Sequence, residues 1–236
     1  FDYIREKGVF SSFFVCGDAT RNIEAMCKTG PDSIHVDENV DLVAAKQVSD
    51  RYNVVMGGNI PLTSVMLHGS QQDNMKIAVD LIDAVNSKSN FVLAPGWDMP
   101  YEIPIENTIG VAQAALNTDE TREMVKNYIA GADFDLDAVE LPDYEHLTKP
   151  LVEVFTLDSA TCAACTYMMG AANVAKATYG DKIDMVEYKF TIKENIARCM
   201  KMGVKNLPSI YINGQLKFSS LIPSKEELEK AIEEVM

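Results

Sequence analysis

The sequence has few of the features that mark a membrane-embedded, secreted or nucleic-acid-binding protein. None of its apolar runs reaches the length of a membrane-spanning helix, and no secretory leader pattern opens the chain. Basic residues are scarce, because 21 Lys and Arg stand against 35 Asp and Glu. Phosphate groups require a basic surface, so we expect neither nucleic acid nor membrane among the partners.

The acidic excess lies almost entirely in the first part of the chain. Residues 1–150 hold 24 acidic and 11 basic residues, whereas residues 151–236 hold 11 and 10. We interpret this acidity as a contribution to solubility. The length of 236 residues suffices for two modest domains or for one large one.

Cysteine is also sparse, with five residues in the whole chain. An odd number at these spacings does not form the disulfide framework of a small secreted domain. It is typical of a protein of the reducing cytoplasm in which one pair of cysteines has a redox function. We therefore expect a cytoplasmic location.

Short apolar strands alternate with amphipathic helices between residues 9 and 116. Strands that are apolar on both faces are typical of a parallel sheet covered by helices. Each unit is about 30 residues long, close to the repeat of an eight-stranded α/β barrel, so four units would form one half of a barrel. A doubly wound open sheet fits the same alternation. The predicted strands are residues 10–15, 33–36, 54–56 and 91–94, and the predicted helices include residues 42–52, 72–85 and 104–116.

The order of elements changes in the last third of the chain. An acidic stretch without periodicity, residues 133–150, is interpreted as a linker between a first domain at residues 1–132 and a second at 151–236. The second domain is predicted to have the order β-α-β-α-β-β-α. Asn213-Gly214 indicates a hairpin within it, and Ser224 opens a capping box before the last helix.

Two cysteines, Cys162 and Cys165, lie where the first strand of the second domain gives way to a helix. Unpaired N–H groups and the helix dipole favour a thiolate on the first cysteine, which lies at the exposed helix start, and the second is one turn further on. We predict that Cys162 attacks a substrate disulfide and that Cys165 resolves the mixed disulfide. Half of a zinc site or two buried thiols would be alternatives, but no second Cys-x-x-Cys and no nearby His completes a metal site. Cys199 follows a helical stripe and is expected to be a buried core thiol.

The dipeptide Leu207-Pro208 stands just before the predicted hairpin. With the order of elements and the dithiol, it resembles the proline loop of the thioredoxin family, most closely the small, glutaredoxin-sized members. The resemblance implies a cis peptide that faces the dithiol, and thus a place for Pro208 in the catalytic site. The sequence departs from the family at Ala163-Ala164, where Gly-Pro is usual, and at Ser209, where threonine is common.

Five segments of the first domain stand at or after its predicted strands: VCGD at residues 15–18, VDENVD at 36–41, GNIP at 58–61, PGWDMP at 95–100 and PIEN at 104–107. In order and spacing they resemble the last four strands of the uroporphyrinogen decarboxylase superfamily barrel, most closely its corrinoid-dependent methyltransferases. In those enzymes zinc activates a thiol substrate and is held by a His-x-Cys and by a Cys in a Pro-Gly-Cys turn. Phe14 and Trp97 occupy two of these positions and only Cys16 remains, so the resemblance implies that the zinc–thiol chemistry is lost or moved. We predict that Cys16 and Trp97 line a substrate-binding pocket.

Three polar residues, Asp37, Asn59 and Asp98, also follow predicted strands. Barrel active sites are built at the carboxyl ends of the strands, so these residues are predicted to line the same pocket. Caps of the loops are the alternative interpretation for all three. His35 lies within the second strand, and we expect a structural role with its side chain directed away from Asp37.

Three functions fit these features. The first is a corrinoid-linked, methyltransferase-like barrel subunit with a fused thiol-disulfide module that uses Cys162 and Cys165. The second is a thiol-disulfide oxidoreductase whose degenerate barrel half is a docking domain, and the third is a non-catalytic binding module. The expected partners are a protein with a dithiol or disulfide and a corrinoid protein that would carry its own cofactor, whereas zinc is not expected.

The half barrel itself indicates a further partner. Four parallel strands leave two unpaired sheet edges, and Phe1 lies within a predicted helix. We therefore expect an amino-terminal barrel half, in the same chain or a separate one, or a homo-oligomer that closes the barrel.

Overall fold

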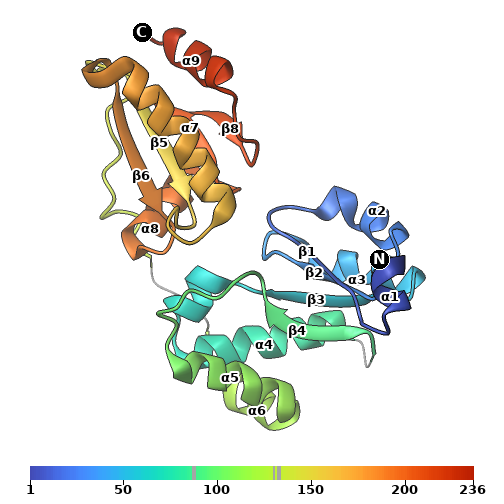
Figure 1. The fold of residues 1–236 in the computed structure, drawn as a ribbon. Coiled ribbons are helices and arrows are strands. Elements are labelled where there is room, and N and C mark those ends of the chain that lie inside the picture. The colour runs from blue at the N-terminus through green and yellow to red at the C-terminus, as the bar shows by residue number, and fades with distance from the viewer. Residues whose placement is uncertain (87–88, 130, 132–133) are drawn as a thin grey trace. The chain divides into compact units, whose positions relative to one another are not determined.

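The structure, a computed structural model, describes residues 1–86, 89–129, 131 and 134–236 (Figure 1). Contacts between Cα atoms divide the chain into two compact units, Phe1–Ala132 and Asp133–Met236. Each unit contains a sheet of four strands. Within the described part of the chain, no helix is both long and apolar enough to cross a membrane.

The first unit is built on four parallel strands in the order β1-β2-β3-β4. Its strands are β1 (Ser12–Val15), β2 (Ser33–Val36), β3 (Val55–Ile60) and β4 (Phe91–Pro95). Its helices are α1 (Asp2–Glu6), α2 (Ile23–Lys28), α3 (Leu42–Arg51), α4 (Gln71–Val85), α5 (Ile105–Leu116) and α6 (Thr118–Val125), with a 3-10 turn η1 (Thr20–Asn22) and a π-helix η2 (Leu62–Leu67). The predicted half of an α/β barrel is confirmed.

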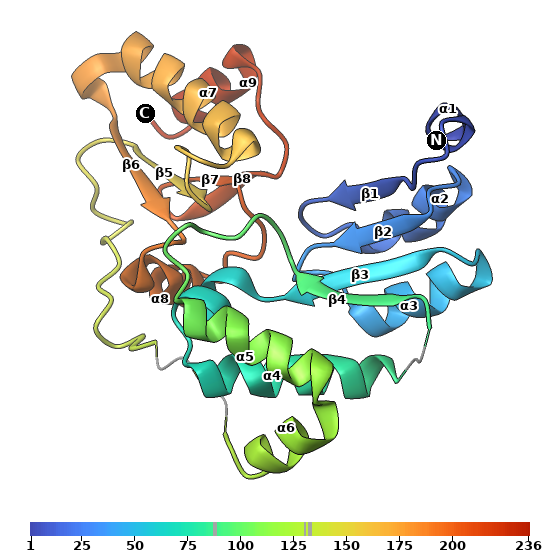
Figure 2. The ribbon, with the colours of Figure 1, turned by 60° about the horizontal axis from the view of Figure 1, so that its bottom comes forward.

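One face of this sheet is covered by helices, with α3 and α4 lying against the strands (Figure 2). Alternate strand residues point to this face, where Ile34, Val36 and Met56 are completely buried. They pack with residues of α2 and α3 in a single apolar cluster. This cluster is the main core of the first unit.

Side chains on the opposite face of the sheet are less deeply buried. Phe14, His35, Gly57 and Val92 lie in register across the four strands. Phe14 remains 38% exposed and Val92 45% exposed. Within the described residues this face is therefore covered less completely than the helical face.

Strand β3 continues beyond its predicted end, because Gly57 and Gly58 are strand residues and do not form a turn. A Cβ atom at Gly57 would overlap the ring of His35, and Gly58 has a φ of +132°, which L side chains rarely adopt. These glycines make room for neighbouring groups inside the sheet. The π-helix that follows was not predicted, because its buried Leu62 and Met66 alone do not distinguish it from a loop.

The second unit has a mixed sheet in the order β6-β5-β7-β8, in which β5 is parallel to β6 and antiparallel to β7. Its strands are β5 (Leu151–Thr156), β6 (Asp184–Lys189), β7 (Ser209–Ile212) and β8 (Gln215–Ser219). Its helices are α7 (Ala163–Tyr179), α8 (Lys193–Met202) and α9 (Lys225–Glu233), with a 3-10 turn η3 (Gly180–Lys182). The predicted order of elements is confirmed.

Helices cover both faces of this second sheet. Met168 of α7 and Ile232 of α9 pack against Val154 of β5 on one face. On the other face Cys199 of α8 packs against Phe155. The predicted burial of Cys199 is confirmed, since the residue is 1% exposed.

Local signals in the second unit lie where the sequence predicts them. Asn213 and Gly214 both have positive φ angles, as a two-residue hairpin turn of the favoured type requires. Ser224 and Glu227 form the predicted capping box at the start of α9.

The segment that we interpret as a linker falls within the second compact unit and contacts its helices and sheet. Lys201 of α8 donates a hydrogen bond to the carbonyl of Val139 at 2.7 Å, and Arg198 donates one to the carbonyl of Glu140 at 3.1 Å. The Tyr144 hydroxyl donates to the carboxylate of Glu153, a completely buried residue of β5, at 3.0 Å. The domain boundaries remain a prediction. Hydrogen bonds hold this segment against α8 and β5.

Candidate functional site

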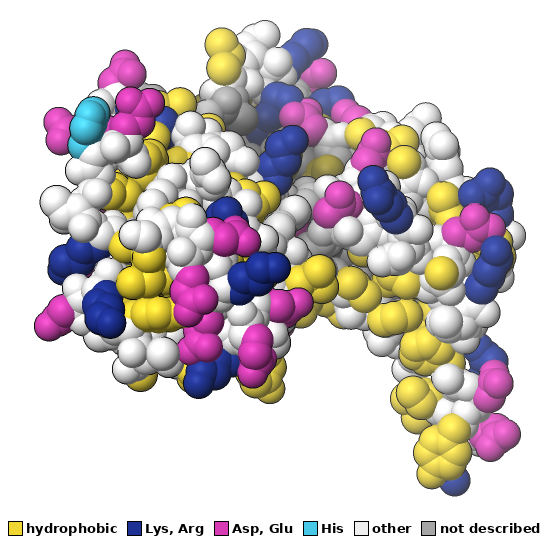
Figure 3. Space-filling view, turned by 90° about the horizontal axis from the view of Figure 1, so that it is seen from above, with side chains coloured by type: hydrophobic (Ala, Val, Ile, Leu, Met, Phe, Trp, Pro, Cys, Tyr) yellow, Lys and Arg dark blue, Asp and Glu magenta, His cyan; other side chains and the backbone are white. Residues whose placement is uncertain are grey.

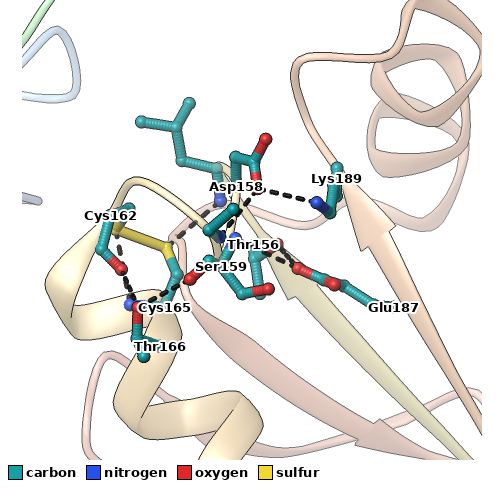
Figure 4. Close-up of a disulfide and its surroundings, with 10 residues drawn as sticks. Thr156, Asp158, Ser159, Cys162, Cys165, Thr166, Glu187 and Lys189 are labelled. Atoms are coloured by element: carbon teal, nitrogen blue, oxygen red, sulfur yellow. Dashed lines mark hydrogen bonds and ion pairs between the residues drawn. A yellow bond between two sulfur atoms is a disulfide. The ribbon is translucent and has the colours of Figure 1, made fainter.

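The two cysteines of the dithiol form a disulfide at the start of α7 (Figure 4). Cys162 is the N-cap of this helix, and its Sγ accepts a hydrogen bond from the Cys165 N–H at 3.4 Å. The Cys165 Sγ accepts another from the Leu157 N–H at 3.3 Å. Cys162 is 8% exposed and Cys165 is completely buried. The first cysteine is therefore the more accessible of the two. The expectation that it lies exposed was wrong, because both cysteines are buried in this oxidised state.

Helix α7 gives the dithiol its electrostatic setting. The helix has 17 residues, and its first N–H groups point toward the N-cap, where the helix dipole favours negative charge. A thiolate at the position of Cys162 gains from both effects. The geometry can therefore stabilise the reactive form of the first cysteine when the disulfide is reduced.

The loop that leads into α7 is held by an ion pair. Lys189, the last residue of β6, lies 2.8 Å from the carboxylate of Asp158. Burial disfavours the charged form of Asp158, but the hydrogen bonds from Lys189 and from the Ala160 N–H outweigh it and lower the pKa of this carboxyl. The carbonyl of Asp158 accepts the Cys162 N–H at 2.8 Å. The ion pair therefore supports the residue that bonds directly to Cys162.

A carboxylate from β6, that of Glu187, contacts the same loop (Figure 4). The Glu187 Oε1 accepts hydrogen bonds from the Thr156 hydroxyl at 2.6 Å and from the Ser159 N–H at 3.2 Å. The Thr166 hydroxyl shares its one proton between the carbonyl of Ser159 at 2.6 Å and that of Cys162 at 3.0 Å. Sequence reasoning missed Glu187 and Lys189, since nothing in a strand predicts contact with a loop 30 residues away.

The proline loop adopts the predicted backbone geometry. The peptide between Leu207 and Pro208 is cis. The Pro208 carbonyl accepts the Ser220 N–H at 2.9 Å, and the Ser209 hydroxyl donates to the carbonyl of Asn206 at 2.6 Å. The first bond fixes the loop to the residue that follows β8, and the second joins the loop to the start of β7. The catalytic role of Pro208 remains a prediction.

In the first unit, three of the predicted pocket residues lie near one another. Cys16 is exposed at the surface, but desolvation by the groups packed around its thiol is the main cause that raises its pKa well above the usual range, and the negative charges of Asp37 and Asp98 raise it further. A thiol in this setting stays protonated near neutral pH and is a poor nucleophile or metal ligand. The charges of Asp37 and Asp98 therefore act on the Cys16 thiol, but they do not activate it.

Asn59 has a structural function in the same region. It is 5% exposed, and its amide donates to the carbonyls of Asp37 at 3.0 Å and Val40 at 2.8 Å. Asp37 in turn accepts hydrogen bonds from the backbone and side chain of Asn39. These bonds shape the loop after β2, as the alternative interpretation of loop caps expects. A substrate contact of either residue remains a prediction.

The region does not fit a zinc ion. The rings of Phe14 and Trp97, which stand at two of the ligand positions implied by the resemblance, pack together with centroids 4.5 Å apart. Among the described residues no group of three or more His, Cys, Asp or Glu is placed to hold a metal ion. We therefore derive no reaction step through zinc.

Two residues of this region were misjudged or missed. Residues two apart in a strand share a face, so alternation does not direct His35 away from position 37 as we expected. The His35 ring instead stacks on Phe14, with centroids 6.3 Å apart. Glu38 was not considered, although it accepts the Leu62 N–H at 2.7 Å and burial raises its pKa to about 7. The glycine at position 96 is a signal that another part of the chain comes close, because a Cβ atom there would lie only 2.9 Å from the backbone nitrogen of Glu38.

Comparison with known proteins divides the chain in the same way. The family model described as uroporphyrinogen decarboxylase (URO-D) matches residues 1–117, and that described as thioredoxin domain matches residues 151–233. A probable thioredoxin of Methanothermobacter thermautotrophicus is 38% identical over 85 residues, which are 36% of this chain and 94% of that protein. A thioredoxin of Methanocaldococcus jannaschii is 32% identical over 87 residues, which are 36% of this chain and 95% of that protein.

The first unit has relatives of a different kind. The methylcobamide:CoM methyltransferase MtbA of Methanosarcina acetivorans is 25% identical over 116 residues, which are 49% of this chain and 32% of that protein. The chain thus spans about a third of the length of that methyltransferase. A solved methyltransferase from Methanosarcina mazei covers 50% of this chain, at 18% identity and a TM-score of 0.44, and 34% of that structure is matched.

Proposed function

Residues 151–233 make this chain a member of the thioredoxin family, and we propose that it is a thiol-disulfide oxidoreductase that uses Cys162 and Cys165. The observation that carries the proposal is the disulfide at the start of α7, with Cys162 as the N-cap and Cys165 buried behind it. The two thiols of the uroporphyrinogen decarboxylase-like unit at residues 1–117, Cys16 and Cys27, both have raised pKa values, so we assign the thiol-disulfide chemistry to the second unit.

The reaction starts from the reduced dithiol. The Cys162 thiolate attacks one sulfur of a substrate disulfide, and the other substrate sulfur leaves as a thiolate that takes up a proton. Cys165 then loses its proton and attacks the Cys162 Sγ, which releases the second substrate sulfur as a thiol. The substrate gains two electrons and two protons, and the disulfide seen here is formed. A dithiol reductant restores the starting state.

Reduction of insulin disulfides by the purified chain, with dithiothreitol as the electron source, tests this proposal. We expect turnover by the wild type and none by Cys162→Ser. Cys16→Ser is the matched control, because it removes a thiol from the other unit. Equal activity of wild type and Cys162→Ser would refute the proposal.

For the first unit we propose a binding function completed by a second half barrel. Within the described residues β1 and β4 each pair with only one neighbour, and unpaired strand edges recruit further strands. Hydrophobic side chains reach the surface on the face drawn in Figure 3, and Phe10, just before β1, is 90% exposed. The complementary half belongs to the same polypeptide, a separate one or a second copy. The 236-residue chain alone should therefore either associate or lack a stable fold in light-scattering and thermal-unfolding measurements, whereas a well-folded, cooperatively unfolding monomer would contradict the proposal.

A second candidate function follows from the methyltransferase relatives, whose name specifies methylcobamide and CoM. In this alternative the barrel half docks onto a corrinoid protein, and the dithiol protects redox-sensitive thiol or corrinoid chemistry in the cytoplasm. Gel filtration of the chain with a cobamide-loaded corrinoid protein provides the test. Visible absorbance that elutes with the chain supports this candidate, and absorbance that elutes separately contradicts it.

A further inference from the structure

We propose that Glu187 is a positioning residue, whose carboxylate holds the loop before Cys162 in the geometry needed for thiol-disulfide exchange. The inference rests on the proposed function and extends it to a residue on β6, a strand that contributes neither cysteine. In the close-up, Glu187 reaches from that strand toward Thr156 and Ser159 (Figure 4).

One oxygen of Glu187 connects two points of the chain on the way to the disulfide. Its Oε1 accepts the hydroxyl of Thr156, the last residue of β5, at 2.6 Å, and the N–H of Ser159 at 3.2 Å. Thr156 is completely buried, so its hydroxyl depends on this acceptor. Hydrogen bonds to a carboxylate are stronger than those between neutral groups. The carboxylate thus fixes the distance between the strand end and the middle of the loop.

The connection continues from Ser159 to the backbone of Cys162. The Thr166 hydroxyl lies 2.6 Å from the Ser159 carbonyl and 3.0 Å from the Cys162 carbonyl, and its one proton is shared between these two acceptors. The Cys162 carbonyl also accepts the Thr166 N–H at 2.9 Å. A displacement of Ser159 would therefore be transmitted to the residue that must attack. Small errors in the position of a reacting group cost large factors in rate.

The contacts identify Glu187 as a hydrogen-bond acceptor in this role. Its two partners are a hydroxyl and a backbone N–H, and both require only an oxygen that accepts. A glutamine in the same place keeps such an oxygen, whereas alanine removes it and leaves the buried Thr156 hydroxyl without an acceptor. A function in proton transfer would instead be lost in both variants.

The experiment compares Glu187→Gln, Glu187→Ala and the surface control Glu226→Ala in the full chain, with kcat/KM for insulin reduction measured across pH. We expect Glu187→Ala to lower kcat/KM about tenfold and Glu187→Gln to remain within about twofold of the wild type, with an unchanged pH profile. Loss of activity in Glu187→Gln equal to that in Glu187→Ala would overturn the inference in favour of proton transfer. Wild-type activity in Glu187→Ala would overturn it altogether.

Thr166→Ala provides an independent variant if Glu187→Ala does not fold. Thr166 is exposed, so the change removes the last step of the connection without opening the core. We expect a several-fold loss of kcat/KM that Thr166→Ser restores, and an unchanged rate in Thr166→Ala would contradict the inference. A wild-type chain without any activity refutes the proposed function itself, whereas an active wild type with unaffected variants refutes only the role of Glu187.

Discussion

Reduction of the disulfide between Cys162 and Cys165 should lower the stability of the second unit by about 1 to 2 kcal/mol. The bond joins residues at a sequence separation of 3, and loop-closure entropy for so short a loop gives about 2 kcal/mol. The reduced state regains part of this lost stability, because a Cys162 thiolate at the N-terminus of α7 gains about 0.3–1 kcal/mol from the helix dipole. For a unit of this size the net loss corresponds to a fall of about 10 °C in the unfolding midpoint.

The assay exploits the single tryptophan of the chain, Trp97, which lies in the first unit. Its fluorescence follows unfolding of that unit, whereas far-ultraviolet circular dichroism follows both. Addition of a phosphine reductant should shift a transition seen by circular dichroism and leave the fluorescence transition in place. A double variant with alanine at Cys162 and Cys165 is the control, and reductant should not move its midpoint. A reduced wild type that is as stable as the oxidised form would refute the reasoning.

Three further predictions concern the first unit. Burial raises the pKa of Glu38 to about 7, so the folded state favours the protonated form. This contribution is fully present below the unfolded pKa of 4.5 and is lost as the pH rises through about 7. Between pH 4.5 and 8, stability measured by Trp97 fluorescence should therefore fall by about 3 kcal/mol more in the wild type than in Glu38→Gln, and equal pH dependence would contradict this. Asn107→Ala should destabilise the same unit by about 1–3 kcal/mol in urea titrations, because the buried amide donates to the carbonyls of Met66 at 2.8 Å and Gly69 at 2.9 Å; no loss would contradict the assignment. Metal analysis of a chain whose dithiol is replaced should find no stoichiometric zinc, and one zinc per chain that disappears in Cys16→Ala would overturn that expectation.

Much of the fold could be predicted because its signals are local. The bounds of β2 and β7 follow directly from short runs with β-branched residues at every second position, which lie between turn residues. Asn213-Gly214 sets the hairpin because few other pairs adopt its φ angles, and Ser224 sets the start of α9 through its cap. In each case the residues that determine the structure are neighbours in the sequence.

The parts that were not predicted depend on contacts between distant residues. Gly57 fits inside a strand next to His35 because the His35 ring fills the space that a side chain at residue 57 would need. The sequence around residue 57 does not reveal this contact. Glu187 supports the loop before Cys162 although it lies in an ordinary strand. Burial of Cys162 likewise was not predicted, whereas its place at the helix start follows from spacing alone.

Trapping of the mixed disulfide distinguishes the functions of the two cysteines most directly. Cys162→Ser and Cys165→Ser, each combined with Cys16→Ser because Cys16 is an exposed free thiol, are incubated in reduced form with a disulfide-containing peptide, and the adducts are measured by intact-protein mass spectrometry. We predict that Cys165→Ser accumulates a covalent adduct of one peptide sulfur at Cys162, because the thiol that would resolve it is missing. Cys162→Ser should accumulate none, because its remaining Cys165 is completely buried. Equal adducts in both variants, or an adduct only in Cys162→Ser, would contradict the assignment.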